Sequence, residues 1–410
     1  MSQRTSLANV PDLVVTGGRL LGAAEPVDVV ITAGVVEAVL PVGTGGATEA
    51  LDAIGCLVLP GLVEAHCHLD KTLFGRPWVS HLARDDLASR IEHDRGRRSE
   101  LGIPDTQAMR ALVSAMADAG TTTLRTHTDV DPEVGLRGVL AVAELAAGVR
   151  DRVDVQQVAF PQHGLLSRPG TAELLDEALQ AGATVVGGLD PAAEGDAAAY
   201  LDVVLGLATR HGAGVDLHFH GHGAEGLREL ELLVERTPAL GLQGRVVASH
   251  CYAFGDLDDA SAGRLAERLA EAGIGVVTAA PYSFPVPPLR RLAEAGVVTG
   301  IGHDGIRDLW GPYGTGDLLE RARHVAYRSG FRRDDDLEVV LRAATTGGRM
   351  LLTGDGRGVE EGAAADLVVV PAENAAAAVV LVPPRTAVVK AGRVSRAAGR
   401  PAPAPAPPER

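Results

Sequence analysis

The chain has 410 residues, 46% of them apolar, so it can build a large core as one barrel with an appendage or as two or three domains. Its 38 basic and 53 acidic side chains leave a net charge of −15, which disfavours nucleic acid and anionic membranes as partners. The three cysteines form no paired framework, which indicates a reducing compartment. The N-terminus lacks the order of a signal peptide, and no unbroken apolar run reaches membrane-spanning length. We therefore predict a cytoplasmic protein.

Strand-like runs separated by glycine turns occupy both ends of the chain. They cover residues 12–16, 27–32 and 35–40 near the N-terminus, and 366–370 and 386–393 near the C-terminus. Short apolar runs with glycine punctuation are typical of β structure. Because the middle of the chain lacks this texture, we predict that the two ends pair into one small β-sandwich domain.

The middle of the chain alternates short apolar runs with longer stretches rich in Ala, Leu, Glu and Arg. Eight such runs occur, at residues 62–66, 122–126, 153–160, 184–189, 214–218, 245–249, 275–279 and 297–301. This alternation predicts a (β/α)8 TIM-like barrel, and a doubly wound open sheet is the rival fold. The predicted domains are a β-sandwich from residues 1–59 and 351–397, a barrel from 60–350, and a disordered proline-rich tail at 398–410.

Side chains with metal-binding chemistry end several of the predicted strands. His66 and His68 end the first, His218 ends the fifth, His250 the sixth, and Asp304 follows the eighth. The carboxyl ends of barrel strands meet at one mouth, where catalytic groups collect, and residues two apart on a strand point the same way. Imidazoles with one carboxylate suit a divalent zinc or iron ion, so the pattern predicts a metal site.

The same segments resemble the amidohydrolase superfamily, and within it the cytosine-deaminase-like branch. The motifs that carry the resemblance are PGLVEAHCHLDK (60–71), RTHTDVD (125–131), AFPQHG (159–164), ASH (248–250), GHD (302–304) and DLW (308–310). The likeness runs from about residue 12 to residue 393. It implies a metal-dependent enzyme that hydrolyses a C–N bond on a small nitrogen heterocycle.

Three further segments resemble the N-isopropylammelide isopropylaminohydrolases, which remove an alkylamine from a triazine ring, more than they resemble cytosine deaminase. They are GGLDPA (187–192), SHCYAF (249–254) and IRDLWGPYG (306–314). The resemblance implies that the metal ligands are His66, His68, His218 and Asp304. It also implies that His250 lies beside the metal-bound water and that Asp304 takes a proton from that water, which makes both residues catalytic.

The substrate contacts are also implied by the resemblance. Gln162 would meet the ring with an amide that offers a donor and an acceptor together. Relatives with two metals bridge them with a carboxylated lysine, usually on the fourth strand, and residues 183–190 contain no lysine. We therefore predict one divalent ion, zinc or iron. Lys71 is interpreted as a substrate-binding charge, beside the metal ligands or at the pocket entrance, and a catalytic role is left as the less favoured alternative. A bridging role would require it to lose its positive charge by carboxylation.

Two glycines depart from the cytosine deaminase pattern. That enzyme carries a proton-shuttling Glu three residues after the fifth-strand histidine, where this chain has Gly221, and an acidic residue after the metal-binding Asp, where this chain has Gly305. Both departures argue against cytosine as the substrate. The proton donor is then expected to be His222 or His220, because imidazole titrates near neutrality. His222 is also expected to contact the substrate.

The remaining expectations concern the pocket and the assembly. Trp310, on the loop after the eighth strand, is the favoured wall for a flat ring, with Phe160, Phe219 and Tyr313 as further candidates. The charged segment 78–98 is expected to be an exposed helical excursion and a possible lid. We expect a small heterocyclic substrate and a homo-oligomer. The alternatives left open are a cyclic amide hydrolase or deacylase of the same superfamily, and an inactive scaffold.

Overall fold

The computed structural model describes residues 10–82 and 86–397, which divide into two compact units. One unit combines the described residues up to Leu62 with those from Arg357 onward, and the other runs from Val63 to Gly356. The predicted tail, 398–410, lies outside the described residues. Within the described part of the chain, no helix combines the length and apolar character that crossing a bilayer requires.

The smaller unit is built on a sheet that joins strands from both ends of the chain. Its strands are β1 (Leu13–Leu20), β2 (Pro26–Thr32), β3 (Val35–Pro41), β4 (Glu49–Asp52), β5 (Leu57–Pro60), β14 (Leu367–Val370), β15 (Ala387–Lys390) and β16 (Arg393–Ala397). β5 pairs antiparallel with β14, which joins the two ends. β1 pairs on one edge with β2 and on the other with both β4 and β5, so the sheet branches there. Helix α13 (Ala375–Leu381) lies between β14 and β15 in the chain.

The larger unit is a parallel eight-stranded barrel. Its strands pair in chain order: β6 (Leu62–Cys67), β7 (Thr121–Asp129), β8 (Asp154–Phe160), β9 (Val185–Leu189), β10 (Gly214–His218), β11 (Val246–Ser249), β12 (Ile274–Thr278) and β13 (Thr299–Ile301). A parallel bridge between Cys67 and Asp304 brings the last strand's end back to the first. All eight predicted strands are present, so the predicted barrel is confirmed and the open sheet is wrong.

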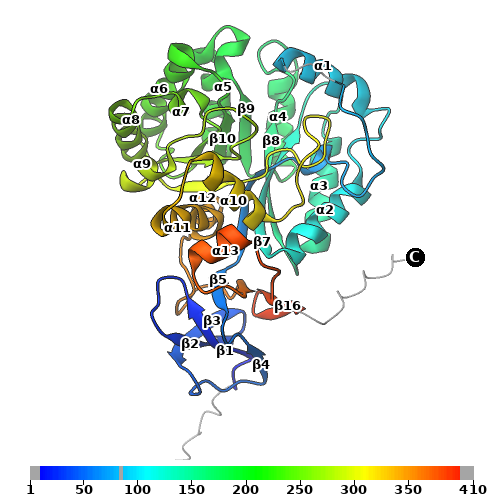
Figure 1. Cartoon of the computed structure of the whole chain (residues 1–410). Coiled ribbons are helices and arrows are strands. Elements are labelled where there is room, and N and C mark those ends of the chain that lie inside the picture. The colour runs from blue at the N-terminus through cyan, green and yellow to red at the C-terminus, as the bar shows by residue number, and fades with distance from the viewer. Residues whose placement is uncertain (1–9, 83–85, 398–410) are drawn as a thin grey trace, which may run out of the picture. The chain divides into compact units, whose positions relative to one another are not determined.

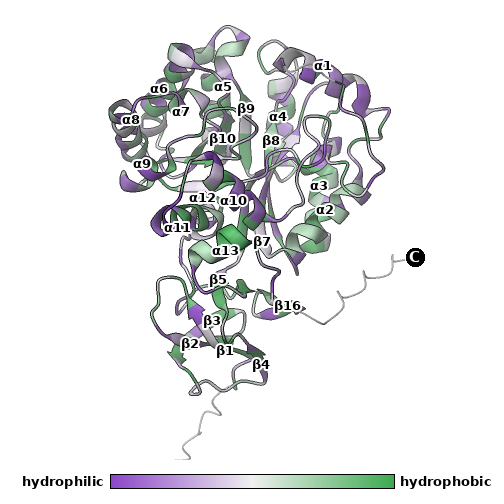
Figure 2. Ribbon diagram, viewed as in Figure 1, coloured by the Kyte–Doolittle hydropathy of each residue, from purple (hydrophilic) through white to green (hydrophobic). Residues whose placement is uncertain are grey.

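Helices surround the barrel strands (Figure 1). They are α2 (Thr106–Asp118), α3 (Arg137–Val149), α4 (Thr171–Gln180), α5 (Ala197–His211), α6 (Gly223–Ala239), α8 (Asp259–Glu271), α9 (Leu289–Glu294), α10 (Leu318–Arg328), α11 (Asp334–Arg342) and α12 (Gly348–Thr353). Most carry hydrophilic and hydrophobic residues together (Figure 2). In α8 the buried residues are Ala262, Leu265, Ala266 and Leu269, a helical spacing that presents one apolar stripe to the strands.

Shorter elements follow several strands on the side of the strand carboxyl ends. They are η1 (Leu69–Lys71), η2 (Pro191–Glu194) and α7 (Tyr252–Gly255), whereas the π-helix η3 (Ala343–Gly347) joins α11 to α12. The predicted excursion at 78–98 contains helix α1 (Leu87–Arg98), and its residues 83–85 lie outside the described residues. The expectation that this helix is exposed is wrong at Asp94 and Arg98, which are buried. Arg98 pairs there with Asp131, at 2.6 Å between Nη2 and Oδ2, because a buried charge needs a partner.

Candidate metal centre and pocket

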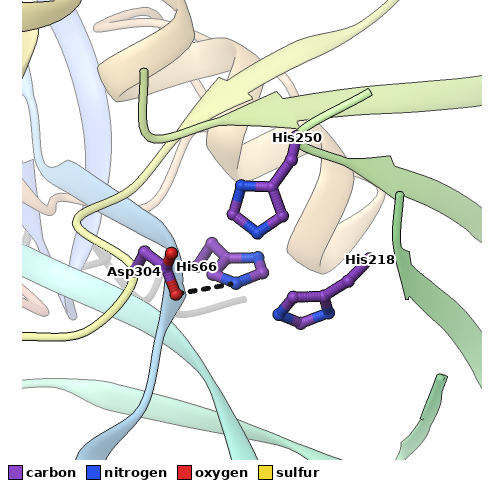
Figure 3. Close-up of side chains that lie close together, drawn as sticks. All are labelled: His66, His218, His250 and Asp304. Atoms are coloured by element: carbon purple, nitrogen blue, oxygen red, sulfur yellow. Dashed lines mark ion pairs between the residues drawn. The ribbon is translucent and has the colours of Figure 1, made fainter. Parts of the chain in front are cut away.

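Four side chains converge at the carboxyl ends of the barrel strands (Figure 3). His66 lies on β6, His218 ends β10, His250 follows β11 and Asp304 follows β13. One ligand atom from each lies within 4.8 Å of the others, and the ring centres of His66 and His218 are 4.5 Å apart. The sequence predicted that these four residues would meet, because barrel strands bring their carboxyl ends together.

His68, the remaining residue of the predicted ligand set, contacts this group from the side. Its Nε2 lies 3.1 Å from Oδ1 of Asp304. It forms a second cluster of ligand atoms with His66 and His127, and the rings of His66 and His127 are 4.0 Å apart. His127, on β7, was quoted in a motif but given no role by the sequence analysis. The signal that points to it is its place near the end of a barrel strand.

The side chains of this centre have the chemistry that a divalent cation requires. Among the described residues, Nε2 of His66 and both ring nitrogens of His218 and His250 have no hydrogen-bond partner although they are buried. Burial lowers the pKa of His66 and His218 well below the usual value, that of His250 to about 4 and that of His68 to about 3, so neutral nitrogen lone pairs are available. Burial alone would raise the pKa of Asp304, but the hydrogen bond with His68 and the nearby imidazoles hold it well below the usual value. Neutral imidazoles with one carboxylate fit zinc or iron.

Hydrogen bonds behind the centre fix the orientation of His66. The hydroxyl of Ser249 donates to Oδ1 of Asp216 at 2.7 Å, and its oxygen lies 3.0 Å from Nδ1 of His66. Since the single hydroxyl proton is used on Asp216, Ser249 accepts from Nδ1–H, and Nε2 of His66 keeps its lone pair for the centre. Arg125 balances the buried carboxylate, at 2.8 Å between Nη1 and Oδ2 of Asp216.

A second buried pair positions Asp304. Glu64 accepts from the backbone N–H of His303 at 2.7 Å and lies 2.6 Å from Nδ1 of its ring. The next residue, Asp304, has a φ of 65°, a conformation that costs energy for a residue with a Cβ and collects at functional sites. Its backbone N–H donates to the carbonyl of His66 at 2.9 Å. The closure of the barrel and the direction of the Asp304 carboxylate are therefore fixed together.

A pocket of about 780 Å³ opens in front of the centre, lined by His68, His218 and Asp304 among others. Lys71 and Gln162 share one wall of it. Nζ of Lys71 donates to Oε1 of Gln162 at 2.7 Å and pairs with Oδ1 of Asp129 at 3.0 Å. Burial opposes the charge of Lys71, but Asp129 and Asp70 raise its pKa above the usual value. The predicted use of the Gln162 amide is therefore altered, because its oxygen already accepts from Lys71.

Other residues expected to contact the substrate lie around the same pocket. Trp310 lines it, with its ring centre 5.8 Å from Nζ of Lys71. His222 lies exposed at the rim, 3.0 Å from a carboxylate oxygen of Asp256. Of the other aromatic candidates, Tyr313 lines the pocket, whereas Phe160 and Phe219 are buried outside its lining. Phe160 instead stacks on the ring of His218 at 4.4 Å.

The family follows from this fold, this centre and a direct comparison. The model of the Amidohydrolase family matches residues 101–396, so the chain belongs to that family. With the barrel and its group of imidazoles and carboxylate, this membership defines the chain as a hydrolase of carbon–nitrogen bonds.

The relatives narrow this class and confirm the predicted branch. The chain is 30% identical over 362 residues to the N-isopropylammelide isopropyl amidohydrolase of Pseudomonas sp. (strain ADP), which covers 85% of this chain and 88% of that protein. The crystal structure of N-isopropylammelide isopropylaminohydrolase from Burkholderia multivorans ATCC 17616 is 43% identical with a TM-score of 0.88, covering 93% and 97% of the two chains. That of 5-methylcytosine deaminase from Klebsiella pneumoniae with 5-fluorocytosine is 28% identical with a TM-score of 0.83, covering 95% and 98%.

Proposed function

We propose that the chain removes an exocyclic amine from a small nitrogen heterocycle by hydrolysis, using one divalent ion, zinc or iron. The observation that carries the proposal is the convergence of His66, His218, His250 and Asp304 at a pocket of about 780 Å³. The names of the relatives support the substrate class, since they refer to ammelide and to a cytosine. Water adds to the ring carbon, the C–N bond breaks, and the products are a hydroxylated ring and a free amine.

In this proposal His66, His68, His218 and Asp304 hold the ion, which when bound lowers the pKa of water and so supplies a nucleophile. Asp304, whose side chain is 29% exposed toward solvent, takes the proton released by the attacking water. His250 donates to or accepts from the attacking oxygen and stabilises the charge that develops on the ring. The five residues thus act as one unit.

Lys71 and Gln162 hold the ring edge in this proposal. The ion pair with Asp129 keeps Lys71 in its ammonium form, which argues against a carboxylated lysine that bridges two metals. With Oε1 of Gln162 accepting from Lys71, the ammonium and the amide N–H groups face ring atoms that accept hydrogen bonds. Trp310 packs on the flat face of the ring.

A release screen tests the function. Protein loaded with zinc or with iron is incubated with pyrimidines, pterins, triazines and creatinine-like rings, and ammonia and alkylamines are measured. We expect amine release that a chelator abolishes and that metal addition restores. Opening of a cyclic amide without amine release would replace this proposal with the cyclic amide hydrolase alternative, and a protein that binds no metal would favour the scaffold.

The role of His250 has its own prediction. His250→Ala should lower kcat by about 10²-fold or more, because it removes a proton-handling and charge-stabilising group. Metal content measured by atomic absorption should stay unchanged. The matched control is His211→Ala at the end of α5, where the ring contacts Asp176 outside the pocket. A near-normal rate in the His250 variant would remove this residue from the mechanism.

A further inference from the structure

A buried carboxyl group from helix α6 forms part of the pocket wall. Glu229 is only 2% exposed, and it lines the pocket together with His220 and Gly221. Its Oε1 accepts a hydrogen bond from the backbone N–H of Ala192, on η2, at 2.5 Å. Its other oxygen, Oε2, is turned toward the loop that follows β10. The sequence analysis gave this residue no role.

Two glycines let this carboxyl group approach the end of β10. A Cβ on Gly221 would lie 2.9 Å from Oε2 of Glu229 and 3.0 Å from the Cα of Gly226. A Cβ on Gly226 would lie 2.5 Å from the carbonyl carbon and oxygen of Gly221. The first turn of α6 therefore packs backbone against backbone on the loop. The Glu229 carboxyl group fills the space that a side chain at position 221 would take.

The groups that face Glu229 favour its protonated form. Its pKa is raised to about 7, chiefly by burial; Asp190 and Glu225 act in the same direction, and the N–H of Ala192 and His220 act against them. His220 itself is held by Asp190, at 3.1 Å between Nδ1 and Oδ2. The ring of His220 lies 4.7 Å from that of His250, so this wall continues into the metal centre.

Loss of an amine requires a proton at the leaving nitrogen, in addition to the groups that serve the ion and the attacking water. In the proposed function the imidazoles and Asp304 serve the ion and the attacking water, and Asp304 takes up the proton of that water. Lys71 is engaged by Asp129 and Gln162. An amine leaves a ring carbon as the neutral molecule only when its nitrogen gains a proton as the C–N bond breaks.

We propose that Glu229 is the catalytic acid that protonates the leaving amine, a role that rests on the proposed function. The C–N bond breaks, its electron pair stays on nitrogen, and the proton on Oε2 moves to that nitrogen. Glu229 is left as a carboxylate, and it regains a proton from the one released by the attacking water. Atoms and charge balance over the cycle.

The test compares Glu229→Gln with Glu235→Gln, a control on the same helix whose side chain is exposed and lies outside the pocket lining. Gln keeps an oxygen for the N–H of Ala192 but cannot donate a carboxyl proton. Two substrates share one ring and differ in the amine, ethylamine or 2,2,2-trifluoroethylamine. We expect Glu229→Gln to lower kcat by about 10²-fold or more for the ethylamine substrate. The loss should be clearly smaller for the less basic amine, and Glu235→Gln should stay within a few-fold of the parent.

The pH profile gives the second readout. The parent rate should fall as pH rises through about 7, because Glu229 must be protonated to act, and this limb should be absent in Glu229→Gln. The proposal would be overturned if Glu229→Gln lowered kcat equally for both amines and left the pH limb unchanged. Glu229 would then only support η2 through its hydrogen bond with Ala192. A pH limb that persists in Glu229→Gln but is absent in His220→Gln would also overturn the proposal, because the titrating acid would then be the imidazole of His220.

Failure of the proposed function is recognised separately. If the parent releases no amine from any ring, the function fails and the role of Glu229 fails with it. If the parent is active and Glu229→Gln matches it, only the role of Glu229 is overturned. Should Glu229→Gln not fold, Glu229→Asp carries the comparison. It keeps a carboxyl group, so it should retain the pH limb at a reduced kcat.

Discussion

Ser249 connects a buried charge to one imidazole of the metal centre. It donates to Asp216 and accepts from Nδ1 of His66, which selects the ring tautomer whose Nε2 faces the ion. In metalloproteins, removal of a partner of this kind typically lowers metal affinity by about 10–100-fold. The sequence could not show this contact, because it joins strands 183 residues apart.

Ser249→Ala should therefore weaken metal binding by about 10–100-fold while leaving the fold intact. The variant lets the His66 ring exchange tautomers and lose its fixed orientation. Competition with a chelator of known affinity measures the change. Ser395→Ala, in the smaller unit, is the matched control. Unchanged affinity in the Ser249 variant would mean that His66 is held by its packing alone.

Asp308 makes stability depend on pH. Burial raises its pKa from 3.8 to about 7, although its Oδ1 accepts from the N–H groups of Trp310 and Gly311 at 2.8 and 2.9 Å. Between pH 4 and 7 the folded chain holds a proton on Asp308 that the unfolded chain releases, so the stability due to this group falls as pH rises. Asp308→Asn keeps an acceptor and removes the titration.

The excess stability of Asp308→Asn over the parent should grow between pH 4 and 7 and level off above that range. Urea unfolding at pH 5, 6, 7 and 8 measures it. Comparison of the two proteins at each pH cancels the titration of all other groups. A difference that stays constant across this range would show that Asp308 ionises normally in the folded state.

At the scale of elements, helix α2 illustrates how local sequence and packing agree. Its N-cap is Asp105, whose Oδ1 accepts from the N–H groups of Gln107 and Ala108 at 2.9 and 3.1 Å. Its buried face packs with β7 in one apolar core, which includes Met109, Leu112, Val113, Met116 and Leu124. The cap satisfies backbone donors that the first helical turn leaves without partners.

Asp105→Ala should lower the free energy of unfolding by about 1 kcal/mol, because those backbone donors lose their partner. Asp105→Asn, which retains a capping oxygen, should lose clearly less. Denaturant unfolding of both variants under one buffer condition provides the comparison. Equal losses would assign the effect to the ion pair with Arg76, which lies 3.4 Å from the other carboxylate oxygen, instead of the cap.

The elements also show where sequence reasoning succeeds and where it ends. The alternation of strands and helices predicted the barrel, and with it the meeting of His66, His218 and Asp304, because strand ends share one mouth. The sequence analysis gave no role to Glu64 or Glu229, since Glu64 is a buried strand residue and Glu229 a helix residue. Their relevance depends on which distant backbone they contact. The closeness of Gly221 and Gly226 is likewise a property of packing that no periodicity encodes.

At the scale of the whole barrel, Gly302 lies where β13 closes on β6, next to the metal centre. β13 is only three residues long, and the chain rejoins β6 through the Asp304 N–H and the His66 carbonyl. Gly302 precedes that point. A Cβ there would overlap the carbonyl oxygen of His66 and lie 2.5 Å from Oε1 of Glu64. Neither the His66 backbone nor the buried Glu64 carboxylate, which makes two hydrogen bonds with His303, can move aside without a large cost in free energy.

Gly302→Ala should lower the free energy of unfolding by about 2 kcal/mol or more, since overpacking a filled interior displaces its neighbours. It should weaken metal binding as well, because the added methyl group pushes β13 and Asp304 away from His66. Gly263→Ala, in α8 with open space around the added Cβ, is the matched control and should be neutral or stabilising. Unfolding curves and chelator competition are measured on the same samples. Loss of stability with full metal affinity would show that the centre does not depend on barrel closure at this seam.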